Sequence, residues 1–182
     1  TRDLGPFREH LKCCTYTPFL PSFSIGSLLL EKPLESRFSL DTLNTFLRAS
    51  KLTPWGAEPR RREGTSICET GRHDSDACHF LSRGDHVQGG VTHDAVCTIH
   101  SHRPAVCASY VCRSNEGLKG LRRWREFETQ LATWENTVAT LLALELGFTL
   151  DDRNFEFKDL EAATEFYRRA YRLVNDIAGV SR

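Results

Sequence analysis

The segment 51–117 limits most strongly what this chain can fold into. Only twelve of its 67 residues are large and apolar, and glycines, histidines and charged residues fill much of the rest. Such a segment buries too little apolar surface to offset its own conformational entropy. It nevertheless carries five of the seven cysteines. We therefore expect an irregular region stapled by a bound metal, because structural metal sites contribute on the order of 10 kcal/mol.

The C-terminal part of the chain, in contrast, is rich in large apolar residues. Between residues 121 and 178, 21 of 58 residues are large and apolar, and they follow a spacing of three and four. This pattern predicts one helix that Gly147 terminates and a second helix from about residue 157 to 178. The connection is short, which favours an antiparallel helical hairpin. We expect Trp124 and Trp134 in its core, and Asp151 and Asp152 to act as a cap.

The N-terminal part contains one clear helix signal. Residues 39–50 place Leu40, Leu43, Phe46 and Leu47 on one face, behind Ser39 as a plausible N-cap. Residues 24–30 fit either a short helix or a strand, because prolines precede and follow them.

These patterns predict a mainly α chain that forms a single domain over residues 1–182. Its region 1–117 is the cysteine-cluster metal-binding part, packed against the helical hairpin of 118–182. Lysine plus arginine and aspartate plus glutamate number 24 each, so the net charge is zero. No long-range field then favours nucleic acid or an anionic membrane. No apolar run approaches the roughly 20 residues that span a bilayer, and we expect a cytoplasmic protein.

The cysteines indicate metal binding rather than disulfides. Seven is an odd number, and a chain of this length needs no disulfide staples. Thiolates are soft ligands that select zinc, copper(I) or iron–sulfur clusters. The spacings contain no Cys-x-x-Cys knuckle of a zinc ribbon and no common ferredoxin run. The cysteines are Cys13, Cys14, Cys68, Cys78, Cys97, Cys107 and Cys112.

The segment CTIHSHRPAVCASYVC, residues 97–112, resembles a known cysteine-cluster family. The family is called CxxCxxCC or YkgJ-like and is regarded as a zinc- or iron-chelating domain. Its motif has cysteines and an Arg-Pro pair at the same spacing. Cys78-His-Phe-Leu resembles the segment before it, and Cys13-Cys14 resembles the end of the family's N-terminal motif. The resemblance covers roughly residues 10–115.

The resemblance implies that the cysteines bind metal. We expect Cys97, Cys107 and Cys112 to hold it, joined by Cys13, Cys14 or Cys78. The family has two more cysteines upstream of the pair, where this chain offers only His10, and Cys68 is available to replace one of them. One site with spare thiols and two separate sites both remain open.

Other polar residues lie beside the cysteines in sequence. His10, His79, His100 and His102 are each a possible ligand or an ordinary loop residue. Arg103 is either a donor to a sulfur or carboxylate or part of a plain turn. We take Arg103 and His100 as candidates for supporting the ligands.

Three functions are compatible with this pattern. The first is an iron–sulfur protein, with a 4Fe–4S or 2Fe–2S centre, for redox or cluster-based modification chemistry on a protein or small-molecule substrate. One relative in the family, a flagellin lysine methylase, is considered an iron–sulfur protein. The second is a structural zinc protein whose helical hairpin binds a partner. The third is a metal-free thiol enzyme, with Cys13-Cys14 or Cys107 as nucleophile and His10 or His100 as base.

Overall fold

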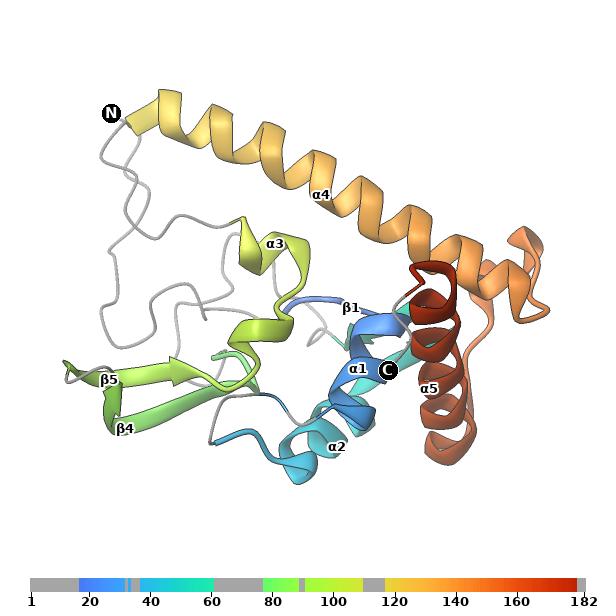
Figure 1. Cartoon of the computed structure of the whole chain (residues 1–182), viewed down its shortest axis with the longest axis horizontal. Coiled ribbons are helices and arrows are strands. Elements are labelled where there is room, and N and C mark those ends of the chain that lie inside the picture. The colour runs from blue at the N-terminus through green and yellow to red at the C-terminus, as the bar shows by residue number, and fades with distance from the viewer. Residues whose placement is uncertain are drawn as a thin grey trace.

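The computed structural model describes residues 17–31, 33, 37–60, 77–88, 91–109 and 117–179. The protein is mostly helical, as the sequence predicts, and its C-terminal region is helical (Figure 1). In chain order the elements are β1 (Leu20–Pro21), α1 (Ser22–Leu30), α2 (Leu40–Arg48), β2 (Ser50–Thr53), β3 (Gly56–Pro59), β4 (Leu81–Gln88), β5 (Val91–Cys97), the 3-10 helix η2 (His100–His102), α3 (Ala105–Ala108), α4 (Gly117–Glu145), the 3-10 helix η3 (Leu150–Asn154) and α5 (Leu160–Ile177).

A small antiparallel sheet joins the N-terminal segment to residues 50–59. Its strand order is β1-β3-β2, and Ala57 at its centre pairs with Leu20 on one side and Leu52 on the other. A Cβ atom on Gly56 would lie 2.1 Å from the carbonyl oxygen of Leu20. Glycine is therefore required there for β1 and β3 to approach each other.

Helix α2 follows the sequence prediction closely. The side chain of Ser39 accepts a hydrogen bond from the backbone N–H of Asp41, which confirms the N-cap. Leu43, Phe46 and Leu47 are fully buried. Leu40, at the first position of the helix, is 53% exposed and does not join that buried face.

Residues 24–30, for which the sequence allowed either a helix or a strand, belong to helix α1. Pro21 occupies its N-cap position, and the helix ends at Glu31, whose N–H donates to the carbonyl oxygen of Ser27 at 2.7 Å. α1 packs mainly against α5. A Cβ on Gly26 would lie 2.1 Å from the carbonyl oxygen of Tyr167. The two helices thus meet backbone to backbone at this glycine.

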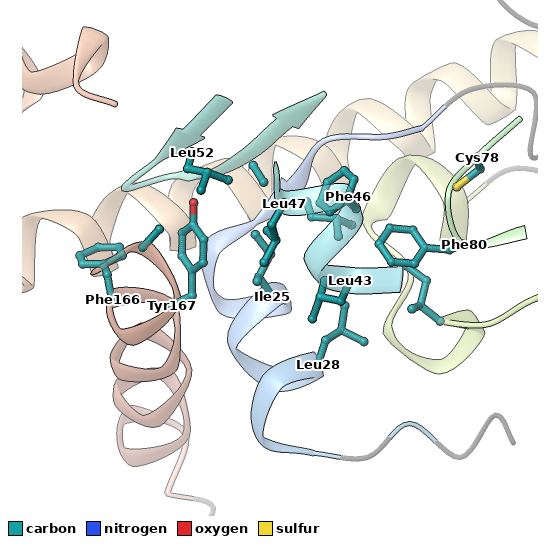
Figure 2. Close-up of a cluster of buried hydrophobic side chains, with 14 residues drawn as sticks. Ile25, Leu28, Leu43, Phe46, Leu47, Leu52, Cys78, Phe80, Phe166 and Tyr167 are labelled. Carbon is teal, nitrogen blue, oxygen red and sulfur yellow. The ribbon is translucent and has the colours of Figure 1, made fainter. Parts of the chain in front are cut away.

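The hydrophobic core cluster draws on β1, α1, α2, β2, β3, α5 and the segment 78–99, but on no described residue of α4 (Figure 2). The described part of the segment 51–117 contributes five residues to this core, and the expectation that its own apolar surface is insufficient stays a prediction. α1, α2 and α5 supply the apolar surface that the segment lacks. The core residues from 51–117 are Leu52, Ala57, Cys78, Phe80 and Ile99.

The end of α4 is as expected, whereas α5 begins at Leu160, three residues after the predicted start. Gly147 has a φ of +97°. Its N–H bonds to the carbonyl oxygen of Leu144, and the N–H of Phe148 bonds to that of Ala143, both at 3.0 Å. This is the Schellman pattern that often terminates helices. The carboxylate of Asp152 accepts hydrogen bonds from the backbone N–H and hydroxyl of Thr149, which confirms the expected capping role.

The expected antiparallel hairpin of 118–182 differs from what is observed. α4 runs along the long axis of the molecule, whereas α5 runs across it and packs mainly on α1 (Figure 1). The reason lies in the connection, where the N–H of Phe157 donates to the carbonyl oxygen of Leu52 at 2.9 Å. Phe148 and Phe157 also pack against Phe166, with ring centroids 5.3 and 5.4 Å away. The connection is thus anchored to the sheet and does not reverse the chain.

The prediction that both C-terminal tryptophans are core residues is wrong for Trp134. Its side chain is 60% exposed, while Trp124 is half-buried. The face of α4 turned to the core carries Ala139, Leu142 and Ala143. The apolar arc of α4 is wider than the face that the rest of the molecule covers.

Candidate metal centre

The β4–β5 hairpin brings two of the predicted cysteine ligands to the same end of the core. Leu81 pairs with Cys97, and the N–H of Leu81 donates to the carbonyl oxygen of Cys78 at 3.0 Å. Beyond the hairpin, the N–H of Thr98 donates to the carbonyl oxygen of Phe80 at 2.8 Å. Cys78 is 8% exposed and belongs to the core cluster, and Cys97 is half-buried against it. The two cysteines therefore lie on the same base of the hairpin, one buried and one half-buried.

The chain after Cys97 turns twice before it reaches Cys107. Nε of Arg103 donates to the carbonyl oxygen of His100 at 3.0 Å, which stabilises the first turn, η2. Pro104 then occupies the N-cap position of α3, and the N–H of Cys107 donates to its carbonyl oxygen at 2.9 Å. Arg103 acts here as a turn residue, the simpler of its two expected roles. The side chain of His100 is exposed.

A carboxylate on α4 fixes the short helix that carries Cys107. Oε1 of Glu135 accepts a hydrogen bond from the backbone N–H of Ala105 at 2.8 Å. This satisfies one of the amide donors that a helix start leaves without an intrahelical partner. Burial raises the pKa of Glu135, and the hydrogen bond from Ala105 opposes that shift. α3 is thus anchored to α4 as well as to the preceding turn.

A second contact ties the N-terminal segment to Cys78. Oγ1 of Thr17 lies 3.0 Å from Nδ1 of His79 and accepts a longer bond, 3.4 Å, from the backbone N–H of His79. Desolvation lowers the pKa of His79, which favours the neutral imidazole. Cys14 is three residues before Thr17 in the sequence. Because three fully extended residues span at most about 11 Å, this length limits the distance between Cys14 and Thr17.

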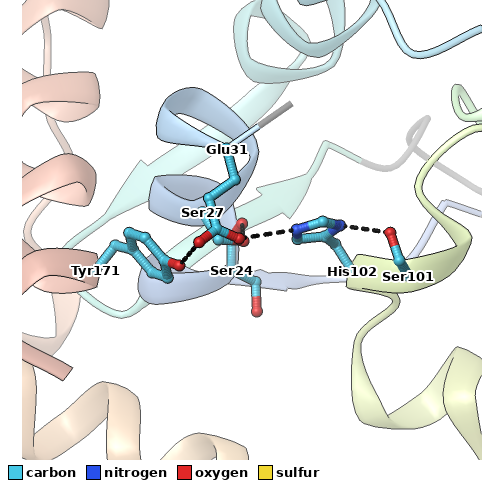
Figure 3. Close-up of polar contacts among 6 residues, drawn as sticks. All are labelled: Ser24, Ser27, Glu31, Ser101, His102 and Tyr171. Atoms are coloured by element: carbon cyan, nitrogen blue, oxygen red, sulfur yellow. Dashed lines mark hydrogen bonds and ion pairs between the residues drawn. The ribbon is translucent and has the colours of Figure 1, made fainter. Parts of the chain in front are cut away.

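The last histidine of the cysteine segment contacts a different partner. Nε2 of His102 lies 3.5 Å from Oε2 of Glu31, and its Nδ1 lies 2.8 Å from Oγ of Ser101 (Figure 3). The hydroxyl of Tyr171 donates to the other oxygen of Glu31. His102 therefore connects the cysteine segment to the end of α1 and to α5. In this arrangement His102 makes a structural contact, and its role as a ligand stays a prediction.

The described residues include only part of the predicted ligand set. Cys78, Cys97 and Cys107 are described, whereas His10, Cys13, Cys14, Cys68 and Cys112 lie outside the described residues. Within the described part of the chain, no group of three or more His, Cys, Asp or Glu side chains is placed to hold a metal. Cys78, Cys97 and Cys107 are all described, so the structure does not bring these three together as one ligand group.

Sequence reasoning missed the residues that position the cysteine segment. Glu31 and Glu135 contact it from distant parts of the chain. Tyr171 in turn contacts Glu31, and Thr17 contacts His79 beside Cys78. No local motif signals such contacts, because they depend on how α1, α4 and α5 pack.

Comparisons with protein-family models, curated proteins and solved structures found no match for this chain. Among the helices that the structure describes, none is both long enough and apolar enough to cross a membrane. The geometry of the site and the sequence resemblance therefore carry the functional argument.

Proposed function

We propose that this protein binds metal through its cysteine cluster and holds an iron–sulfur centre for redox or modification chemistry. The observation that carries the proposal is the pairing of Leu81 with Cys97, which brings Cys97 and Cys78 to one end of the core. Cys107 follows on a helix that Glu135 anchors. These thiols come from separate stretches of sequence and lie in partly shielded positions. Their convergence on one metal centre is part of the proposal.

The donor chemistry fits a soft metal. Thiolates favour iron–sulfur clusters, zinc and copper(I) over hard cations. The contact of Thr17 with His79 brings the chain close to Cys78 at a point only three residues after Cys14. Cys13 and Cys14 are therefore the first candidates to complete the site, with Cys68, Cys112 and His10 as further ones. When bound, an iron–sulfur centre supplies electron transfer or activates a substrate at an open iron position.

A structural zinc site is the second candidate. It is favoured by the small share of the core that residues 77–109 provide, namely Cys78, Phe80 and Ile99 from the hairpin base and its following turn. A zinc ion would then stabilise this region, and the exposed apolar face of α4 would be left for a partner. In either case we propose a cytoplasmic protein that acts on a protein or small molecule, and not on nucleic acid or a membrane.

The proposal is tested by purifying the full chain without oxygen and measuring its visible absorption with its iron, zinc and acid-labile sulfide content. A broad visible band with iron and sulfide supports the iron–sulfur centre. Stoichiometric zinc without colour supports the structural alternative. A well-folded protein with neither metal would refute both and favour the thiol enzyme.

Two matched variants on α3 localise the site. Cys107→Ser removes a proposed ligand, and Ala108→Ser places the same side chain at the neighbouring exposed position. We expect Cys107→Ser to lose metal and soluble yield together, while Ala108→Ser keeps both. A fully metallated, well-folded Cys107→Ser protein would exclude Cys107 from the ligand set.

A further inference from the structure

A cavity of about 340 Å³ lies between the end of α2, the β2–β3 hairpin and the segment before α5. This volume is at the lower end of the range of small-molecule pockets, which is about 300–1,000 Å³. Backbone hydrogen bonds fix its walls. The N–H of Arg60 donates to the carbonyl oxygen of Ala49 at 3.3 Å, and the N–H of Phe157 donates to that of Leu52 at 2.9 Å. The cavity is therefore built from segments that the fold holds together.

Three cationic side chains line this cavity, one from each of its walls. Arg48 ends α2, Arg60 follows β3 and Lys158 precedes α5. The acidic residue among the lining residues is Glu156, whose carboxylate pairs with Nη2 of Arg60. Among the residues that the structure describes, none forms an ion pair with Arg48 or Lys158. Two positive charges are thus left without a counter-charge at the cavity.

Helix stability explains only one of these two charges. A cation in the last turn of a helix offsets the negative end of the helix dipole, and Arg48 has that position in α2. Lys158 lies instead directly before Asp159, the N-cap of α5, where the helix dipole is positive and a cation is unfavourable. The charge of Lys158 therefore indicates an anion from outside the chain.

The cavity also has an apolar lining. Leu47 and Leu52 are buried members of the core cluster (Figure 2). Phe157 and Leu160 are half-buried and pack against the same cluster. An inorganic anion would use the cations but leave this apolar surface in contact with water, whereas an organic anion uses both.

We propose that this cavity binds a small phosphate monoester with an apolar organic part. A phosphate monoester carries a charge of about −1.5 to −2 at pH 7, which matches the two unpaired cations. The planar guanidinium of Arg48 suits phosphate oxygens, and Lys158 adds a compact charge. None of the residues that line the cavity is a predicted metal ligand, so this binding does not depend on the cysteine cluster.

The test is isothermal titration calorimetry of the full chain with phenyl phosphate at constant ionic strength. A pH of about 8 makes the phosphate a dianion, because its second pKa is about 6. Inorganic phosphate, which lacks the apolar part, and phenol, which lacks the charge, are the comparison ligands. We expect saturable one-to-one binding of phenyl phosphate and binding at least about tenfold weaker for each comparison ligand. No saturable binding of phenyl phosphate, or equal affinity for either comparison ligand, would overturn the proposal.

Matched variants localise the site. Arg48→Gln and Lys158→Gln should each weaken the binding of phenyl phosphate about threefold to fivefold, since both side chains are exposed. Arg169→Gln on α5 and Lys51→Gln on β2 are the controls, because neither residue lines the cavity, and they should leave the affinity unchanged. Circular dichroism shows whether each variant is folded, and Lys158→Gln decides alone if Arg48→Gln disturbs α2. Equal losses in site and control variants, or none in folded site variants, would overturn the proposal.

Discussion

Replacing Gly26 with alanine tests the contact that holds α1 against α5. The new Cβ would lie 2.1 Å from the carbonyl oxygen of Tyr167 and 2.6 Å from the Cβ of Tyr171. Both neighbours are fixed parts of α5, since one is a backbone atom and the other is bonded directly to the backbone. The clash cannot be relieved by rotating a side chain, so the two helices must separate.

The size of the effect follows from two opposing contributions. Alanine in place of glycine inside a helix gains about 1 kcal/mol of intrinsic stability. Overpacking in a close-packed interior costs about 1–3 kcal/mol and occasionally more. Separation from 2.1 Å to an ordinary contact of 3.4 Å needs about 1.3 Å, and a gap of about 1 Å already loses up to half of each dispersion contact nearby. We expect the cost of this clash to lie at or above the upper end of that range. After the helix-propensity gain is subtracted, the free energy of unfolding should fall by about 2 kcal/mol.

The assay is urea unfolding followed by tryptophan fluorescence. A loss of stability lowers the midpoint at an unchanged slope. For a chain of this length, 2 kcal/mol corresponds to a decrease in Tm of about 4–8 °C. Gly147→Ala is the comparison, because Gly147 has a φ of +97° and a Cβ added there would meet nothing within 4 Å. It should cost only the left-handed backbone penalty of about 1–2 kcal/mol.

A neutral or stabilising Gly26→Ala would refute the reasoning. It would mean that the stability gained from the helix propensity of alanine is larger than the cost of the steric clash. α1 and α5 would then lie further apart at Gly26 than the structure places them.

Two further substitutions test local features of the fold. The buried hydroxyl of Tyr167 lies 3.1 Å from the carbonyl oxygen of Thr53 and 3.2 Å from that of Gly56, so Tyr167→Phe should lower the free energy of unfolding by about 1–2 kcal/mol. Burial raises the pKa of Tyr167, so its phenol ionises more readily in the unfolded chain. Stability should therefore fall as the pH rises above about 10, and part of that fall should be missing in Tyr167→Phe when unfolding is measured across this range. Ser39→Ala removes the side-chain acceptor for the N–H of Asp41 and should cost about 1 kcal/mol in the same denaturation assay, whereas Ser39→Asp should retain most of the stability.

The sequence predicted those features that neighbouring residues determine. The cap at Ser39, the end of α4 at Gly147 and the capping role of Asp152 each depend on a few adjacent positions. Such signals are local, because the side chain or glycine acts on the backbone within one turn.

The sequence did not predict which elements pack together. Two long helices with a short connection normally lie antiparallel, but the bond from Phe157 to Leu52 directs α5 onto α1 instead. The exposed position of Trp134 has the same origin, because α5 packs on α1 and does not cover α4 as the predicted hairpin would have done.

The sequence proposes residues for the candidate site but does not give their arrangement. Residue types and spacing single out Cys78, Cys97 and Cys107. Their relative positions depend on the β4–β5 register, and alternating polar and apolar residues in that segment are too weak to fix a register. The supporting contact of Glu135 with Ala105 joins residues 30 positions apart.

The contact between α1 and α5 also orders events during synthesis. Tyr167, a fully buried member of the core, leaves the ribosome sixty residues after Cys107. At about 5–20 residues per second, that interval is roughly 3–12 s. During it the thiols of Cys78 and Cys97 are already outside, while the core beneath them still lacks its last helix. For the proposed metal-binding role those thiols have to stay reduced until α5 is added, so oxidation in this interval would compete with metal binding.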